Sequence, residues 1–307
     1  MIGLTRLQVF LAVAQCMSFS AAAAQLHLTQ PTISHHIKVL ERELGAPLFD
    51  RTGNGLRLTE AGSLLVPRAR RLVHDAIKIQ QVIESLDERV AGHLRIACSS
   101  ATGKYVLPLF AARFHERHPD ITVSVVRCAP PDVVAGLLGG STDLGVISNE
   151  ADTAGMECQE FFNDHIILIV PPRHPWAVRP CVEPSELVDV PLIIREPTSG
   201  TRRALLTQLG QHNILVDDLN VFLEVGNSEA IIKTVEAGFG VSFVSRLAAA
   251  WALELGTVVE VPLAGCELHR TVYVARPEMQ ETHRAADAFW GFVHDPSNAD
   301  LRKMAEK

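Results

Sequence analysis

The sequence has few aromatic residues and no long apolar run. Aromatic residues make up 6% of its 307 residues, and no uninterrupted apolar stretch reaches the roughly 18 residues that a membrane-spanning helix needs. Residues 1–14 lack the basic stretch and the small-residue cleavage site of a secretory signal. From these absences we expect a cytoplasmic protein without a membrane partner.

Cysteine pairs and catalytic motifs are also missing. The six cysteines lie far apart and form no C-x-x-C pair, which favours reduced thiols over a disulfide framework or a zinc site. Glycine-rich nucleotide-binding motifs, H-E-x-x-H and G-x-S-x-G do not occur. Adjacent histidines such as His35 and His36 diverge by about 100° on a helix, so they do not converge on a metal. We therefore expect no enzyme, and no catalytic residue, bound metal or cofactor.

The composition is that of a folded protein with an uneven charge. An apolar content of 47% and ordinary glycine and proline usage exclude a disordered or collagen-like chain, and the length suits two or three domains. The net charge of −7 alone argues against nucleic acid as a partner. However, residues 1–71 carry eight Lys or Arg against four Asp or Glu, whereas residues 93–307 carry 18 against 27. The N-terminal end is therefore the part suited to a polyanion.

Two regimes of secondary structure follow each other along the chain. Residues 4–89 have a helical pattern, and residues 88–92 form a polar segment ending in glycine that suits a hinge. From Gly92 onward short apolar strands alternate with helices, which is typical of open α/β layers. The expected strands are Leu94–Cys98, Ile121–Val126, Leu144–Ile147, Ile166–Val170, Leu192–Arg195, Val221–Val225, Val241–Val244, Val258–Val261 and Thr271–Val274.

Residues 20–44 predict a helix-turn-helix. Ser20 is placed to cap a short alanine-rich helix, which ends at a turn over His27-Leu28. Thr29 then caps a second helix, with Pro31 in the first turn, where a missing N–H costs nothing. Helical spacing gives this second helix one apolar face, made of Ile33, Ile37, Leu40 and Leu44.

The opposite face of the second helix is polar and positive, and of a size to enter a major groove. After it, residues 48–58 predict a two-stranded wing, on which Arg51 and Arg57 flank a Gly-Asn-Gly tip. For Lys38 or Arg42 alone, an ordinary solvated surface explains the charge equally well. The combination favours DNA binding, with contacts from Gln30, Pro31, Thr32, Ser34, His35, Lys38 and Arg51.

A seven-residue apolar repeat follows the wing. Leu65, Leu72, Ile79 and Leu86 recur at this interval, and Ala69, Ala76, Ile83 and Val90 fill the positions four further on. This register is typical of a two-stranded coiled coil, although a helix packed on its own protein's core shows the same face. Pro67 predicts a kink or a late helix start. We expect a homodimer with half-sites about 34 Å apart or a multiple of that, held by Leu65, Leu72, Ile79, Ile83 and Leu86.

Hydroxyl-rich stretches follow three of the expected strands. Ligands of open α/β sheets bind at strand ends, and two of these stretches lead into helices whose N-termini favour an anion or carboxylate. Taken singly, each hydroxyl is more often a helix N-cap than a ligand contact. The candidate ligand contacts in these stretches are Ser99, Ser100, Thr102, Ser148, Asn149 and Thr201.

The N-terminal motifs together resemble the LysR-type transcriptional regulators. The internal spacings agree over about sixty residues, and departures occur at His35-His36 and Asn54, positions that bear on base preference. The matching motifs are L-x-x-L-x-x-F from Leu4, S-F-S-x-A-A from Ser18, L-x-x-T-Q-P-x-x-S from Leu26, L-G-x-x-L-F-x-R from Leu44 and L-T-x-A-G from Leu58.

This resemblance implies an α+β multidomain fold. A winged helix-turn-helix would span residues 1–58, and a linker and dimerisation helix with its hinge would span 59–91. Residues 92–307 would form a two-lobed α/β effector domain similar to a periplasmic binding protein. Its lobe I would comprise about 92–164 and 268–295, and its lobe II about 165–267.

The resemblance also implies a function. A regulator of this family would bind double-stranded promoter or operator DNA as a dimer of dimers, a homotetramer, under the control of a small-molecule effector. The segments T-S-G-T-R from Thr198 and G-N-S-E-A-I from Gly226 resemble a branch concerned with sulfur, nitrogen or inorganic-carbon assimilation, which favours a small anion or short carboxylate. Two prolines in residues 127–132 remove N–H donors. These residues would therefore give one wall of the effector pocket its shape more than they would provide hydrogen bonds. The alternative is a small-molecule-binding protein whose N-terminal helices serve only oligomerisation.

Overall fold

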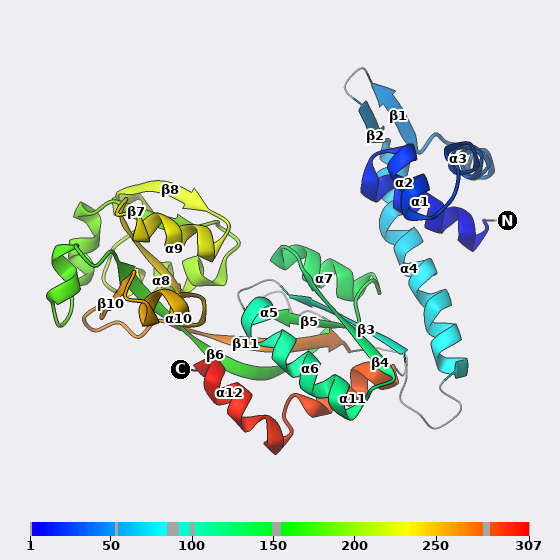
Figure 1. Cartoon of the computed structure of the whole chain (residues 1–307). Coiled ribbons are helices and arrows are strands. Elements are labelled where there is room, and N and C mark those ends of the chain that lie inside the picture. Colours follow the sequence, from blue (N-terminus) through cyan, green and yellow to red (C-terminus); the bar gives the residue numbers. More distant parts are fainter. Residues whose placement is uncertain are drawn as a thin grey trace. The chain divides into compact units, whose positions relative to one another are not determined.

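The computed structural model describes residues 2–52, 55–84, 92–98, 102–148, 155–278 and 283–306. The chain forms two compact units (Figure 1). One runs from helix α1 (Leu4–Cys16) to helix α4 (Glu60–Glu84). The other runs from strand β3 (Gly92–Cys98) to helix α12 (Ala299–Glu306).

The first unit is a helix-turn-helix with a short hairpin. Between α1 and α4 it contains α2 (Phe19–Gln25), α3 (Gln30–Leu44), β1 (Phe49–Thr52) and β2 (Gly55–Leu58). β1 and β2 pair in antiparallel register, as the sequence predicts for a wing. One apolar cluster joins all these elements, and its fully buried large side chains are Phe10, Ile33, Leu40 and Leu48.

Capping residues set the helix limits in this unit. The Thr29 side chain accepts a hydrogen bond from the Thr32 N–H, and Gly45 ends α3 in the left-handed conformation at φ 69°, where a residue without Cβ is unstrained. The prediction of Ser20 as the cap of α2 is wrong. Ser18 caps α2 instead, because it has extended backbone and accepts from the Ala21 N–H at 3.3 Å, whereas Ser20 already lies inside the helix.

Pro67 predicts a kink or a late start for α4, and of these two the late start is wrong. The helix begins at Glu60 and includes Pro67 in its interior. The hydroxyl of Thr59 accepts a hydrogen bond from the Gly62 N–H at 3.0 Å and thereby caps the helix start, well before the proline.

The second unit is a two-lobed α/β structure built on one sheet. In the described residues the sheet has nine strands in the order β4-β3-β5-β11-β6-β9-β7-β8, with β10 on β6. β3, β4 and β5 are parallel in lobe I, and β7, β8 and β9 are parallel in lobe II. The strands after β3 are β4 (Ile121–Arg127), β5 (Leu144–Ile147), β6 (Met156–Val170), β7 (Leu192–Arg195), β8 (Val221–Val225), β9 (Val241–Ser245), β10 (Val259–Val261) and β11 (His269–Pro277).

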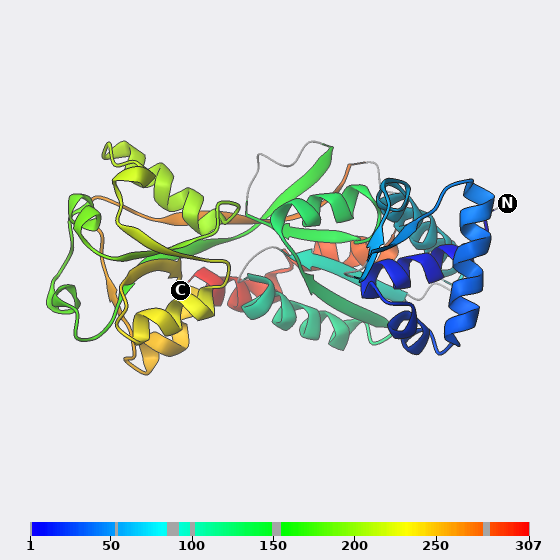
Figure 2. The same ribbon diagram turned by 90° about the horizontal axis from the view of Figure 1, so that it is seen from above.

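β6 and β11 pass from one lobe to the other (Figures 1 and 2). They pair with each other in antiparallel register up to His165 opposite His269, and from Ile166 onward β6 pairs with β9 of lobe II. The expected strands Ile166–Val170 and Thr271–Val274 are only parts of these longer strands. The missing part of β6 has polar residues such as Glu157 and Gln159, which hid it from a search for apolar runs.

Helices cover the sheet in both lobes. Lobe I carries α5 (Thr102–Tyr105), α6 (Leu107–Arg117), α7 (Pro130–Leu138), α11 (Arg284–Phe292) and α12. Lobe II carries α8 (Gly200–Gln211), α9 (Ser228–Glu236) and α10 (Arg246–Glu254). Short 3-10 turns are η3 (Pro175–Val178), η4 (Pro184–Asp189), η5 (Val216–Asp218) and η6 (Pro296–Asn298).

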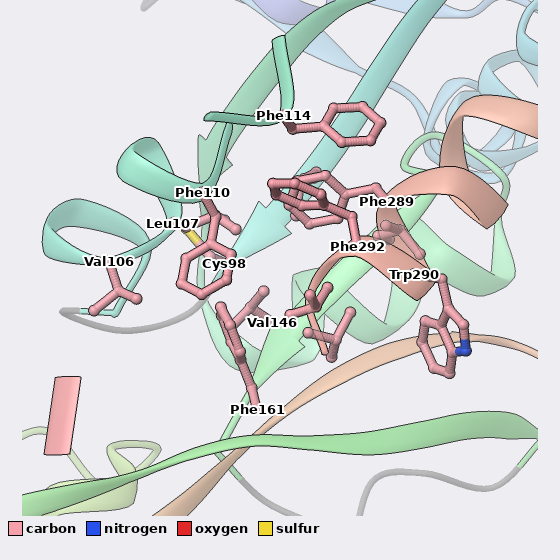
Figure 3. Packing of buried hydrophobic residues seen from close by; sticks show 14 of the residues in the cluster. Cys98, Val106, Leu107, Phe110, Phe114, Val146, Phe161, Phe289, Trp290 and Phe292 are labelled. Atoms are coloured by element: carbon pink, nitrogen blue, oxygen red, sulfur yellow. The ribbon is translucent and has the colours of Figure 1, made fainter. Parts of the chain in front are cut away.

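Each lobe has its own hydrophobic core. In lobe I, phenylalanines of α6 and α11 interdigitate above the sheet (Figure 3), with Phe114 and Phe289 at a ring-centroid distance of 5.0 Å. Leu301 of α12 belongs to the same core, so lobe I extends beyond residue 295. In lobe II one apolar cluster includes Leu205 of α8, and another includes Ile231 of α9.

A helix that spans a membrane has to be both long and apolar. Among the described residues no helix meets both requirements by itself, and α1 with α2 meets them only as a pair bent by 120°.

Candidate functional site

The outward face of α3 is the first candidate site. Ile33, Ile37 and Leu40 are buried on the inner face of this helix. The predicted contact residues lie on the other side: Gln30, Pro31, His35 and Lys38 are exposed, and Thr32 and Ser34 are half-buried. No described carboxylate lies within ion-pair distance of Lys38, so its charge is available to a partner.

Hydrogen bonds fix the wing relative to α3. The Glu41 carboxylate accepts the backbone N–H groups of Leu48 and Phe49, at 2.8 and 3.4 Å. At Gly62 a Cβ would lie 2.2 Å from the Leu48 carbonyl oxygen, so only glycine allows α4 to pack this closely. The start of β1 is therefore fixed by α3 through Glu41 and by α4 through the close contact at Gly62.

The wing carries the predicted arginines. Arg51 lies on β1 opposite Leu56, and its side chain falls outside the described part of the chain. Arg57 on β2 is exposed and lies opposite Asp50. The predicted tip, residues 53–54, is not among the described residues.

The residues predicted to hold the dimer have different environments along α4. Leu65 packs against the core of its own unit, as the alternative interpretation of the repeat expects. Leu72 and Ile79 are 53% and 62% exposed, and they leave an apolar stripe beyond that core. Ile83 lies in α4 with its side chain outside the described part, and Leu86 lies outside it altogether.

The second candidate site lies at the start of α8, between the lobes. A Cβ placed on Gly200 would be 2.6 Å from the Ser148 hydroxyl oxygen, so the end of β5 and the start of α8 approach closely. Thr201 is buried within the first turn of α8. Thr102 begins α5 with its side chain outside the described part, and Ser99, Ser100 and Asn149 fall outside it as well.

Sequence reasoning missed a buried charged group at the same place. Arg270 of β11 donates to the Asp164 carboxylate of β6 through Nε and Nη2, at 2.9 and 2.6 Å. Ser245 of β9 donates to the other oxygen of Asp164 at 2.6 Å. The only sequence signal is an isolated arginine beside the apolar run of β11. Its partner lies over a hundred residues away, so the pair became visible only in the fold.

A cavity of about 310 Å³ opens where β4, β7 and β8 end. Lys104, Arg127 and Arg195 bring positive charge to its walls, and Glu196 and Glu229 bring negative charge. Residues 128–130 form one wall, consistent with the proline-rich shape predicted there. Arg195 is held by a two-pronged contact with the Glu196 carboxylate, at 2.7 and 2.8 Å. The cavity is therefore polar, and Arg195 and Glu196 in its wall are paired with each other.

The lobes also meet directly at the edge of this cavity. Glu229 of α9 accepts hydrogen bonds from Lys104 at 2.5 Å and from the Tyr105 hydroxyl at 2.6 Å. Burial acts to raise the pKa of Glu229, but these two hydrogen bonds outweigh it and hold that pKa below its usual range. Burial, followed by the contact with Glu229, raises the pKa of Tyr105. Hydrogen bonds from Lys104 and Tyr105 of α5 to Glu229 of α9 thus join the two lobes.

Two protein-family profiles match the chain. Residues 4–63 match the bacterial regulatory helix-turn-helix protein, lysR family, and residues 87–296 match the LysR substrate binding domain. The chain is 32% identical over 297 residues to the uncharacterized HTH-type transcriptional regulator YeiE of Escherichia coli K12, across 97% of this chain and 98% of YeiE.

Solved structures share the fold. Full-length CbnR complexed with its target DNA has a TM-score of 0.73 at 22% identity, over 95% of this chain and 99% of that one. The regulatory domain of CcmR from Synechocystis PCC6803, in complex with 2-PG, has a TM-score of 0.60 at 24% identity, over 66% of this chain and 95% of that one.

A helix-turn-helix unit followed by a two-lobed α/β unit defines a transcriptional regulator with an effector-binding domain. Both family profiles bear the name of one group, and the relative at 32% identity is described as an HTH-type transcriptional regulator. The chain belongs to the LysR family of transcriptional regulators.

Proposed function

We propose that this regulator binds operator DNA as a homodimer, assembles as a dimer of dimers, and changes its DNA binding when a small anionic effector occupies the cleft of the second unit. Gln30, Pro31, Thr32, Ser34, His35 and Lys38 line the major groove, and Arg51 holds the wing on the phosphate backbone. Catalysis is not part of this proposal.

The observation that supports the proposal most directly is that α3 has one buried apolar face and one exposed polar face. Its inner face is buried in the unit core, so the exposed polar face with Lys38 is held rigidly outward. A helix presented this way, beside an arginine-bearing wing, suits a major groove and its flanking phosphates. CbnR, which shares the fold, is known in complex with its target DNA.

The proposed effector class depends on the start of α8. Helix N–H groups, the Ser148 hydroxyl and a nearby guanidinium suit an anionic oxygen group better than a neutral or aromatic ligand. The CcmR regulatory domain, similar in fold, binds 2-PG. Thr201 contacts the effector from the same helix in this proposal.

Salt-dependent DNA binding tests the proposal against the alternative in which the N-terminal helices serve only oligomerisation. Using DNA fragments selected for binding to the wild type, the dissociation constant is measured at several salt concentrations for Lys38→Ala combined with Arg51→Ala. We expect weaker binding at low salt. The slope of log K against log salt should fall by about one for each phosphate that the variant no longer neutralises.

The matched control is Lys303→Ala, which removes one exposed lysine from α12 in the other unit. It should leave both the affinity and the slope unchanged. If the double variant binds as tightly as wild type at every salt concentration, the assigned surface is wrong. If the wild type selects no DNA, the regulator proposal itself fails and the alternative is favoured.

A further inference from the structure

The two lobes of the second unit touch each other away from the strands that connect them. Tyr105 of α5, in lobe I, packs against the lobe I core and also against the lobe II cluster that contains Ile231. Leu247 of α10, in lobe II, packs in the opposite direction, against the lobe I core. The apolar contact is therefore reciprocal, because each lobe sets one side chain against the other.

A polar contact lies beside this apolar one. The Glu229 carboxylate of α9 accepts hydrogen bonds from Lys104 Nζ at 2.5 Å and from the Tyr105 hydroxyl at 2.6 Å. The side chains of Lys104 and Glu229 are 53% and 36% exposed, so solvent screens their ion pair. The hydrogen bond from the half-buried Tyr105 is better shielded, and its charged acceptor makes it stronger than a bond between neutral groups.

Glu229 is held firmly on lobe II. It lies in the first turn of α9, where the Asn227 side chain accepts the backbone N–H groups of Glu229 and Ala230 at 2.8 and 3.4 Å. A carboxylate is favoured at this end of a helix by the positive end of the helix dipole. Ile231 and Ile232 bury the same turn in lobe II. The carboxylate therefore moves with lobe II.

Tyr105 is held equally firmly on lobe I. It is the last residue of α5, and the next two residues, Val106 and Leu107, are fully buried in the lobe I core. At Gly103 a Cβ would lie 1.8 Å from Cys98 Sγ, so only glycine lets α5 pack this closely on β3. The phenol ring therefore moves with lobe I.

We propose that Lys104, Tyr105, Glu229 and Leu247 form a latch that holds the two lobes closed, and that breaking this latch is the main step when the lobes separate. All four side chains belong to the chain itself, so the latch needs neither an effector nor DNA. The paired strands β6 and β11 join the lobes but can bend between them. A contact beyond these strands fixes the bend.

The latch also borders the cavity at the ends of β4, β7 and β8. Lys104 and Glu229 belong to its wall, one from each lobe. When the latch breaks, these two parts of the wall separate and the cavity widens. The frequency of that opening therefore bears on how fast any molecule exchanges with the cavity, whatever its charge.

Single-molecule fluorescence energy transfer on the full chain tests the latch. A donor and an acceptor dye are attached through noncanonical amino acids at Asp120 in lobe I and Val178 in lobe II, both of which are exposed. Labelled chains are diluted into an excess of unlabelled chains, so that both dyes report on one molecule. With no ligand added, we expect the wild type to populate one closed state with rare excursions to lower transfer efficiency.

Two variants break the latch from opposite lobes. Tyr105→Phe keeps the packed ring and removes the hydroxyl, and it should raise the ratio of separated to closed molecules about tenfold, the effect of losing a hydrogen bond to a charged group. Glu229→Gln should have a smaller effect in the same direction, because an amide oxygen still accepts the hydroxyl. Since both changes act on one hydrogen bond, their combined effect should be less than the product of the two.

Glu236→Gln is the matched control on the same helix. Glu236 also accepts hydrogen bonds from one lysine and one hydroxyl, Lys233 and Thr257, each at 2.6 Å, but both partners belong to lobe II. This variant should leave the ratio of separated to closed molecules at the wild-type value. A merely structural role for these carboxylates would give both variants the same effect.

Three results would overturn the latch. The first is a wild type that populates the separated state as often as Tyr105→Phe does. The second is an equal effect of Glu229→Gln and Glu236→Gln. The third is full multiplication of the effects of Tyr105→Phe and Glu229→Gln in the double variant. Circular dichroism of each variant reports its folding, and if one latch variant does not fold, the other provides the comparison with Glu236→Gln.

Discussion

Gly62 shows at the scale of one residue how tightly the first unit is assembled. Its missing side chain lets α4 contact the Leu48 carbonyl, where a Cβ would lie at 2.2 Å, and backbone atoms cannot move aside as a flexible side chain can. We expect Gly62→Ala to lower the free energy of unfolding by about 1–3 kcal/mol, the usual cost of overpacking. Urea unfolding of the full chain, followed by circular dichroism, measures it.

The control for this change is Gly210→Ala in α8. Nothing lies within 4 Å of a Cβ at Gly210, so this substitution should be neutral or stabilise the helix by up to about 1 kcal/mol. Equal behaviour of the two variants would mean that the close approach at Gly62 is not a constraint on stability.

Residue-scale prediction succeeded where the signal is local. Thr29 and Gly45 were recognised as helix limits because capping depends on neighbouring backbone only. Ser18 was missed because Ser20 is an equally good capping residue, and only the observed backbone separates them. Arg270 was missed for a different reason: its meaning depends on Asp164, which the sheet brings opposite it.

At the scale of elements, ion pairs attach the C-terminal segment, residues 295–306, to α6. Arg113 of α6 makes a two-pronged contact with Asp300, and Arg117 contacts Asp295 at 3.0 Å. Hydrogen bonds from Ser297, reinforced by Arg117, lower the pKa of Asp295 to about 2. The hydrogen bond from Arg113 lowers the pKa of Asp300 to about 2.

These lowered pKa values predict an acid-sensitive attachment. A carboxylate whose folded pKa is depressed stabilises the fold above its unfolded pKa, near 3.9, and this contribution is lost as the pH falls towards about 2. We expect hydrogen exchange in α12 to accelerate as the pH falls through that window, after correction for the intrinsic rate. Asp300→Asn should show the faster exchange already at pH 6.

A surface aspartate outside this segment provides the control. Asp189→Asn in lobe II is exposed and should leave exchange in α12 unchanged at every pH. A wild-type profile that stays flat from pH 6 to pH 2 would show that the two ion pairs do not hold the segment.

Prediction of whole elements depended on their environment. Buried strands such as Leu192–Arg195 and Leu144–Ile147 were found with their observed limits, because a strand enclosed on both faces is a plain apolar run. The first part of β6 escaped notice because exposed polar residues interrupt its buried ones without a regular alternation, and α12 because Leu301 and Ala305 are its only buried residues. Both are elements whose place is set by tertiary contacts.

At the scale of the whole molecule, the apolar stripe of α4 bears on assembly. Leu72 and Ile79 are spaced seven residues apart and remain exposed in the single chain. We expect Leu72→Glu combined with Ile79→Glu to weaken the proposed dimer at least tenfold, because two charges would be buried at its seam. Sedimentation velocity over a concentration series measures the association.

Leu64→Glu is the matched control for assembly. Leu64 is 55% exposed on the same helix, close to the 53% of Leu72, but it lies outside the seven-residue register. It should leave association unchanged. Equal weakening in both variants, or in neither, would place the dimer interface elsewhere on the chain.

The pair of strands that joins the lobes has a mechanical consequence. β6 and β11 run side by side and are bonded to each other from Met156 to His165, so they form a ribbon in place of two separate tethers. A ribbon flexes across its face but resists sliding in its plane, because sliding would break every rung of the ladder. The lobes therefore vary mainly by bending and twisting of this ribbon. Ligands of different outline that fix the same bend and twist would be indistinguishable to the rest of the molecule.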